Sequence, residues 1–283
     1  MMPLRRPKSW RQGVTRGVAR TLLELARQAV DETREIEIVR ERVWISGLPG
    51  SFEGFTLVHL SDIHHSAFVD ADYIAHAVAL ANRLAPDVIV LTGDYVSHSR
   101  SYIGGVAERL GDLRARVGVY AVLGNHDFWT GPEALTRALR RHGIEVLRNA
   151  HTYVRRGGEA LGLAGIDDLT VGEDDLLAAL RGLDRRWPTL LLSHHPNILW
   201  SAAHARVALV LAGHTHGGQI NIPSWRRRLR RYWPILRGHG RYGPTQIYVN
   251  RGLGTVLIPV RYRCRPEITL LELRRAPEAD GSV

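Results

Sequence analysis

Cysteine and long apolar runs are the two features that this chain lacks. Cys264 is the single cysteine, which excludes an internal disulfide framework and a zinc site built from cysteine thiolates. No apolar run reaches the ~18 residues of a membrane-spanning helix, so the sequence predicts none. The N-terminus lacks the compact apolar segment of a secretory signal, and Arg5-Arg6 without it is a weak twin-arginine signal. We therefore expect a cytoplasmic location.

The overall composition is that of a globular protein. The 283 residues are 45% hydrophobic and 23% charged, which argues against disorder. The length suits one large α/β domain or two small ones. Charge is unevenly distributed, because residues 1–34 carry a net +5 and residues 225–242 a net +7 out of a total of +10. Two basic segments are thus attached to a nearly neutral body.

The N-terminal basic segment has a helical pattern. Apolar residues recur at helical spacing, with basic residues opposite; they are Val14, Val18, Leu22, Leu25 and Ala29. Two interpretations stay open: a helix packed on the body or a frayed tail, and a helix lying on a membrane surface.

Further along, apolar runs alternate with helical patterns. Strands are predicted at 55–60, 87–91 and 119–123, and helices at 70–84, 101–116 and 132–141, with Asp70 as the cap of the first helix. The second half is richer in strands, predicted at 152–154, 161–165, 190–193, 208–211, 219–222, 246–250 and 267–273. This order favours an α/β sheet in one domain. The predicted organisation is a basic N-terminal helix or tail at 1–34, a domain at 35–274 and a polar tail at 275–283.

Polar clusters follow five of these strands. They are Asp62-Ile63-His64, Gly93-Asp94, Gly124-Asn125-His126-Asp127, Ser193-His194-His195 and Gly213-His214-Thr215-His216-Gly217-Gly218. Sites in α/β sheets form at the carboxyl ends of strands. Asp, His and Asn offer oxygen and nitrogen ligands, which suit Mn, Fe or Zn. Any one of these motifs is weak alone, since Asp94 could equally be a helix cap, but five in order are specific.

The spacing within the clusters also indicates shared ligands. Residues i and i+2 of an extended segment point to the same side. Asp62 with His64, and His214 with His216, are therefore predicted to present two ligands each to one centre. The intervening glycines let the backbone turn sharply or approach closely.

This ordered set resembles the calcineurin-like metallophosphoesterase family over residues 56–222. A narrower resemblance, carried by Gly213–Gln219, Gln246-Ile247-Tyr248, Arg251-Gly252-x-Gly254 and Cys264–Glu267, is to a bacterial branch. That branch contains phosphodiesterases and an enzyme that cleaves UDP-2,3-diacylglucosamine. The resemblance implies a four-layer αββα sandwich of two mixed sheets with a dinuclear metal site at the strand ends.

The resemblance also implies roles for individual residues. Asp62, His64 and His216 would hold one divalent metal ion, Asn125, His194 and His214 the other, and Asp94 would bridge the two. His126 would face the substrate as the catalytic residue, either as the general acid for the leaving oxygen or as a cationic donor to a phosphoryl oxygen. His59, His65 and His195 have no such role and are interpreted as structural residues or supports of the site. Ser97 stands where protein phosphatases carry the Asp that orients this His, so a Ser/Thr protein phosphatase is not supported.

The implied activity is phosphoester or pyrophosphate hydrolysis by a hydroxide that bridges two Mn, Fe or Zn ions. The basic run after the last metal motif bears on the substrate, because Arg suits phosphate and Trp suits a lipid headgroup boundary; its arginines are Arg226, Arg227, Arg228, Arg230 and Arg231. We therefore expect a phosphate-containing or nucleotide-linked lipid as substrate, at an anionic membrane surface.

Two alternatives remain at this point. The run could be a solvated loop on a general phosphodiesterase or phosphatase with no lipid preference. A basic nucleic-acid-binding protein with a vestigial metal site is the second, since bases stack on aromatic residues beside basic grooves. The intact ligand set disfavours it. The sequence does not fix the oligomeric state.

Overall fold

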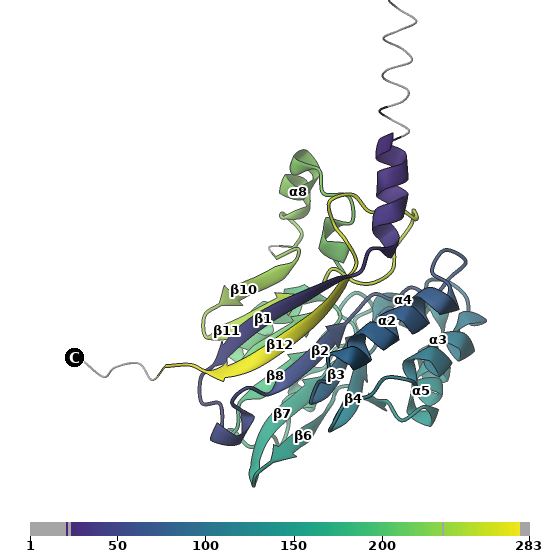
Figure 1. Ribbon diagram of the computed structural model, residues 1–283. Helices are drawn as coiled ribbons and strands as arrows, with labels where there is room; N and C mark the ends of the chain where they lie inside the picture. Colours follow the sequence, from purple (N-terminus) through teal and green to yellow (C-terminus); the bar gives the residue numbers. More distant parts are fainter. Residues whose placement is uncertain (1–20, 22–23, 234, 278–283) are drawn as a thin grey trace, which may run out of the picture.

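Two stacked mixed β-sheets form the centre of the molecule (Figure 1). The computed structural model describes residues 21, 24–233 and 235–277. In strand order, the first sheet consists of β1 (Glu37–Ile45), β12 (Glu267–Arg275), β2 (Thr56–Leu60), β3 (Val88–Thr92), β4 (Gly118–Val122) and β5 (Glu145–Val146). The second consists of β10 (Gly238–Tyr242), β11 (Thr245–Val249), β9 (Leu209–Ala212), β8 (Thr189–Leu192), β7 (Glu159–Gly165) and β6 (Ala150–Arg156).

The strands that lead to the site are parallel within each sheet. In the first sheet β2, β3, β4 and β5 pair in parallel, and β12 joins them antiparallel to β2. In the second, β7, β8, β9 and β11 are parallel, with β6 and β10 antiparallel at the edges. Strands covered on both faces are apolar throughout, and every residue of β3 and β9 is buried.

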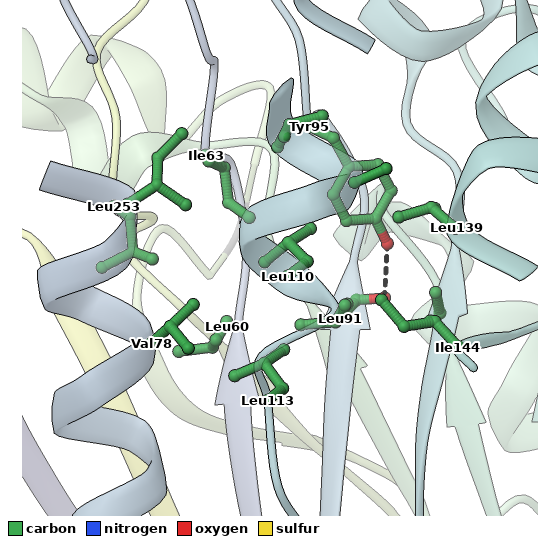
Figure 2. Close-up of a cluster of buried hydrophobic side chains, with 14 of the residues drawn as sticks. Leu60, Ile63, Val78, Leu91, Tyr95, Leu110, Leu113, Leu139, Ile144 and Leu253 are labelled. Carbon is green, nitrogen blue, oxygen red and sulfur yellow. Dashed lines mark hydrogen bonds between the residues drawn. The ribbon is translucent and has the colours of Figure 1, made fainter. Parts of the chain in front are cut away.

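Helices cover the outer faces and complete four layers. One core lies between the sheets, and two others lie between each sheet and its helices. The helices on the first sheet are α2 (Ala71–Arg83), α3 (Tyr102–Leu110) and α5 (Pro132–Arg141), and those on the second are α6 (Leu176–Leu180) and α7 (Leu199–His204). Figure 2 shows the first helix–sheet core, in which the Tyr95 hydroxyl donates to the Leu91 carbonyl at 3.2 Å. The αββα sandwich expected from the sequence is therefore confirmed.

Helix α2 illustrates how the local sequence determines an element. The Asp70 side chain accepts a hydrogen bond from the Tyr73 backbone N–H at 2.8 Å and caps the helix as predicted. Ile74, Ala77 and Val78 lie on the buried face, at the spacing of an amphipathic helix. Helix α5 also has the predicted limits.

Two element predictions were wrong, and one helix was missed. The strand predicted at 219–222 is absent from the described residues, where Gln219 has a φ of 45° and only an isolated bridge joins Ile220 to Tyr262. The helix predicted at 101–116 begins at Tyr102 and ends at Leu110, with Gly111 as its C-cap. No helix was predicted between the strand at 119–123 and the helix at 132–141, and the structure has a short one there, α4 (Asn125–Thr130).

The helix at residues 24–31 and helix α8 (Pro223–Leu229), one from each basic segment, lie at the same end of the molecule (Figure 1). Residues 24–31 form an exposed helix, while most of the predicted helix at 14–30 lies outside the described residues. Helix α8 (Pro223–Leu229) has no buried residue. Within the described part of the chain, no helix has both the length and the apolar character needed to span a bilayer. The predicted boundaries at 34 and 274 stay predictions.

Candidate metal centre

The ends of β2, β3, β4, β8 and β9 bring all five polar clusters to one place. Asp62, His64, His194 and His216 are buried, as are Asp94 and Asn125, while His126 and His214 are half-buried. These side chains lie between the ends of the two sheets. Each sheet therefore contributes side chains to a single cluster of potential metal ligands.

A first group consists of Asp62, His64 and His216. The Nε2 atoms of the two imidazoles lie 3.1 Å apart, and His216 Nε2 lies 3.3 Å from Asp62 Oδ1. The two rings are stacked with centroids 4.9 Å apart. Their ligand-type atoms lie within 4.8 Å of one another, which is close enough to share one cation.

A second group consists of Asn125, His194 and His214. His214 Nδ1 lies 3.1 Å from Asn125 Oδ1 and 3.2 Å from His194 Nε2. The Nδ1 atom of His194 donates to the Thr92 carbonyl at 2.7 Å, which leaves Nε2 free to face the cluster. This hydrogen bond fixes the orientation of the ring.

Asp94 lies between the two groups. Its Oδ2 atom is 3.5 Å from His64 Nε2 in the first group and 3.2 Å from His194 Nε2 in the second. The other oxygen, Oδ1, accepts a hydrogen bond from the His126 backbone N–H at 2.9 Å. A Cβ at Gly124 would collide with this oxygen, so glycine is required there.

The backbone of the ligand motifs differs from the one expected. Asp62, His64, Asp94, His214 and His216 have φ values between 50° and 69°, a left-handed conformation that costs on the order of 1–3 kcal/mol per non-glycine residue. The sequence predicted that each pair, Asp62 with His64 and His214 with His216, lies on an extended segment with both side chains on the same side. The extended backbone in that prediction was wrong. The pairs converge because tight turns aim both side chains inward. Hydrogen bonds such as His64 N–H to the Asp94 carbonyl, 2.9 Å, hold these turns.

Burial sets the charge of the cluster. It lowers the pKa of His64 to about 3 and that of His214 to about 2, so both imidazoles are neutral near pH 7. Burial also raises the pKa of Asp62 to about 6, and the nearby Asp94 carboxylate adds to this shift. The cluster thus combines neutral imidazole nitrogens with buried carboxylates whose negative charge is not fully balanced by neighbouring positive groups.

Asp94 and His194 form the one strongly ionic contact described within the cluster. Burial opposes charge on both groups. Nevertheless, the charge of His194 holds the pKa of Asp94 well below its usual range, and Asp94 raises the pKa of His194 above its ordinary value.

The donor set fits divalent cations. Nitrogen atoms of different imidazoles face one another at 3.1 and 3.2 Å, beside two buried carboxylates. A cation between them would join these atoms and offset the cost of burying the carboxylates. Imidazole, carboxylate and amide donors without sulfur match Mn, Fe or Zn.

His126 lies at the edge of the cluster and is oriented by a backbone group. Its Nδ1 atom donates to the Ser97 carbonyl at 2.8 Å, which leaves Nε2 available to a substrate. His98 stacks on the ring at 5.6 Å, and Trp129 meets it edge-on at 4.8 Å. The sequence showed that no Asp stands at position 97, but it could not show that the Ser97 main chain takes over the orienting role.

Asp127 ties two of the motif loops together. Its carboxylate accepts from the backbone N–H groups of Asp94 at 2.7 Å, Tyr95 at 2.8 Å and Gly124 at 2.9 Å. Burial and the Asp94 charge raise the pKa of Asp127, and the N–H donors oppose that shift. Asp127 therefore positions Asp94 relative to helix α4, which carries His126.

The three histidines without a predicted metal role lie around the cluster. His59 Nε2 pairs with Thr92 Oγ1 at 2.8 Å, and His65 Nδ1 donates to the Val69 carbonyl at 2.8 Å. His195 packs against His214 with ring centroids 4.4 Å apart. These contacts agree with a supporting role.

The arginine run borders the second group. Trp233, just after the run, meets the His214 ring with centroids 5.7 Å apart. Thr215 Oγ1 donates to the Leu236 carbonyl at 2.6 Å, and this hydrogen bond holds the residues after the run against the last metal motif. Its arginines are exposed and do not join the cluster; they are Arg226, Arg227, Arg228, Arg230 and Arg231.

Comparisons with known proteins agree with this centre. The chain is 33% identical over 249 residues to the uncharacterized metallophosphoesterase YkuE of Bacillus subtilis (strain 168), covering 86% of this chain and 87% of that protein. It is 32% identical over 246 residues to phosphodiesterase YaeI of Escherichia coli (strain K12), covering 84% and 88%. It is also 35% identical over 261 residues to a transmembrane protein with metallophosphoesterase domain from Danio rerio, covering 87% of this chain and 59% of that protein.

A family model also matches the chain. The model described as calcineurin-like phosphoesterase matches residues 55–218, which include the whole cluster from Asp62 to His216. The chain therefore belongs to the calcineurin-like phosphoesterase family, and it is a metal-dependent phosphoester hydrolase.

Proposed function

We propose that this hydrolase cleaves a phosphodiester or pyrophosphate bond in a phosphate-containing or nucleotide-linked lipid at an anionic membrane surface. The observation that carries the lipid preference is the position of the exposed arginine run, whose Trp233 touches His214 in the candidate metal centre. The name of the E. coli relative, a phosphodiesterase, supports diester cleavage. The name of the zebrafish relative, a transmembrane protein, supports action at a membrane.

The residues of the cluster divide into two sets in this proposal. Asp62, His64 and His216 would hold one divalent cation, and Asn125, His194 and His214 a second. Asp94 would contact both. Such a pair, when bound, supplies an activated water nucleophile and neutralises phosphoryl charge.

His126 would handle the proton of the leaving group. The Ser97 carbonyl holds Nδ1–H, so the ring presents Nε2 toward the substrate. When His126 carries both protons, Nε2 can donate to the oxygen that leaves phosphorus. Trp129 and His98 restrict the motion of the ring by packing against it. General acid catalysis of this kind contributes roughly 10²–10⁴-fold.

The exposed basic segment would hold the enzyme at the membrane. Each Arg near an anionic leaflet contributes about 1 kcal/mol, and Arg guanidinium groups also pair with phosphate oxygens. Trp225 is 54% exposed and Tyr232 is 63% exposed, and such side chains favour the headgroup boundary. The segment therefore offers both charge and interfacial aromatic groups beside the centre.

Vesicle binding tests this assignment. With Arg226, Arg227, Arg228, Arg230 and Arg231 changed to Ser, affinity for anionic phosphatidylglycerol vesicles should fall by about two orders of magnitude, since loss of three engaged arginines removes about 3 kcal/mol. Sedimentation with anionic and neutral vesicles measures it. Wild-type binding should weaken with added salt, because exposed charges are screened beyond about 8 Å at physiological ionic strength.

A matched variant separates position from net charge. It carries Ser at five other exposed arginines, Arg83, Arg137, Arg141, Arg181 and Arg185, and should keep most of the vesicle binding. Equal losses in both variants, or indifference to lipid charge, would contradict the role of the arginine run. The general phosphodiesterase alternative would then stand, and stronger binding to duplex DNA than to vesicles would favour the nucleic-acid alternative.

A further inference from the structure

An apolar cavity opens beside His126. It has a volume of about 240 Å³ and lies between three segments, 66–68, 97–102 and 255–258. The lining includes Phe68, Tyr102, Leu257 and Ile258, and no Asp, Glu, Lys or Arg lines it. The other lining residues are Ser66, Ala67, Ser97, His98, Ser99 and Thr255.

The cavity presents large apolar side chains to solvent. Phe68 is 63% exposed, Leu257 is 89% exposed and Ile258 is 47% exposed. Leu257 also has a φ of 64°, a conformation that is costly for a leucine. Exposed apolar groups around a concave surface mark binding sites, and backbone strain of this kind concentrates at functional sites.

The loop that carries Leu257 is anchored to the metal motif. The Gln219 side chain donates to the carbonyls of Val256 and Ile258, both at 3.1 Å, and accepts from the Val256 N–H at 2.9 Å. Gln219 lies three residues after His216, and only 9% of it is exposed. These bonds place the apolar tip at a set position relative to the centre.

The opposite wall of the cavity is continuous with the residues that orient His126. Ser97 lines the cavity and its carbonyl accepts the His126 Nδ1 proton at 2.8 Å, while His98 lines it and stacks on the His126 ring at 5.6 Å. His126 is the group assigned to protonate the leaving oxygen. Ser97 and His98 therefore lie between His126 and the cavity, and a chain on that oxygen would pass these two residues to enter it.

We propose that this cavity binds a hydrocarbon chain attached to the leaving-group oxygen of the substrate. This inference rests on the proposed function. The cavity is smaller than the roughly 300–1,000 Å³ of sites that enclose a whole ligand, so it accepts one segment of a chain. On hydrolysis, water adds to phosphorus, the bond to the leaving oxygen breaks and His126 supplies its proton. The released alcohol keeps its chain in the cavity.

A series of methyl aryl phosphodiesters, each used below its critical micelle concentration, tests the proposal. The leaving phenols carry hydrogen, ethyl, butyl or hexyl at the 4-position, which changes chain length with little change in phenol acidity. We expect kcat/KM to rise by up to about fourfold per carbon, and at least about tenfold from phenyl to 4-butylphenyl. Pentyl phenyl phosphate is an isomer of the methyl 4-butylphenyl ester with the added carbons on the other oxygen. It should stay within about twofold of the methyl phenyl ester.

Surface variants assign the effect to the cavity. Leu257→Ser and Phe68→Ser should bring the ratio of kcat/KM for the 4-butylphenyl and phenyl esters close to 1. Leu177→Ser, at a leucine of α6 that is 79% exposed, should keep the wild-type ratio. Calorimetry gives a second readout, in which 4-butylphenol binds wild type with a negative heat-capacity change and binds Leu257→Ser more weakly.

The outcomes distinguish this inference from the function beneath it. A wild-type ratio in Leu257→Ser and Phe68→Ser, or an equal gain for pentyl phenyl phosphate, would overturn the cavity assignment alone. Loss of vesicle binding in Leu257→Ser with an unchanged ratio would assign the loop to the membrane and also overturn it. No hydrolysis of any ester by metal-loaded wild type would overturn the proposed function and this inference together.

Discussion

Changing Asp94 to asparagine should lower metal affinity by more than about 100-fold and lower kcat at least as much. Loss of a residue that only supports a metal ligand already costs roughly 10–100-fold. Asp94 does more, because Oδ2 lies within 3.5 Å of imidazole nitrogens in both halves of the cluster. The amide keeps the shape of the side chain and removes the negative charge between the two sites. Elemental analysis and steady-state kinetics at fixed metal concentration measure the two effects.

Asp72→Asn provides the control for this change. Asp72 is exposed on α2, away from the cluster, so the control variant should keep wild-type metal content and activity. Among single changes at the seven proposed ligands, Asp94→Asn should have the largest effect. Full metal content and full activity in Asp94→Asn would show that Asp94 does not bridge two cations.

Changing His126 to alanine should have a different outcome, with metal content retained and kcat lowered by about 10²–10⁴-fold. His126 is not among the proposed ligands and the Ser97 carbonyl holds its Nδ1, although its ring lies with His64 and Asp94 in a group whose ligand-type atoms are within 4.8 Å of one another. The loss should depend on the leaving group. It should be small for a nitrophenolate, which leaves without a proton, and large for an alkoxide.

His76→Ala is the matched control, because His76 is exposed on α2. It should be unchanged in both metal content and rate. If His126→Ala lost equal activity toward good and poor leaving groups, the general-acid role would be wrong. His126 would then keep only the role of a charged hydrogen-bond donor to a phosphoryl oxygen. If the variant lost metal, His126 would join the ligands instead.

Local patterns in the sequence predicted most elements that position the site. Apolar runs bounded by polar clusters located β2, β3 and β4 to within a residue or two, and the Asp70 cap located the start of α2. The pairing of strands that lie far apart in the sequence was harder to predict. β1 pairs with β12, with Glu37 opposite Glu267, and the partly polar surface of β1 gave no period-2 signal strong enough to predict it.

The identity of the clustered residues was predictable, but their geometry was not. Ligand-type side chains after parallel strands meet at one end of a sheet, as Asp62 and Asp94 do in the first sheet, and stacking of the two sheets brings His194 of the second to them. The left-handed backbone of Asp62 and Asp94 was not foreseen, since residues other than glycine adopt it only when surrounding contacts impose it. The Ser97 carbonyl was equally hidden, because every residue carries one and only the fold places this one against His126.

The central claim is that one cluster holds two divalent cations with Asp94 between them. Anomalous X-ray diffraction from crystals of the metal-loaded protein tests it most directly. The account predicts two peaks about 3.5–4 Å apart, one among Asp62, His64 and His216 and the other among Asn125, His194 and His214. A single peak, two peaks away from Asp94, or no peak in crystals grown from protein saturated with metal would contradict it.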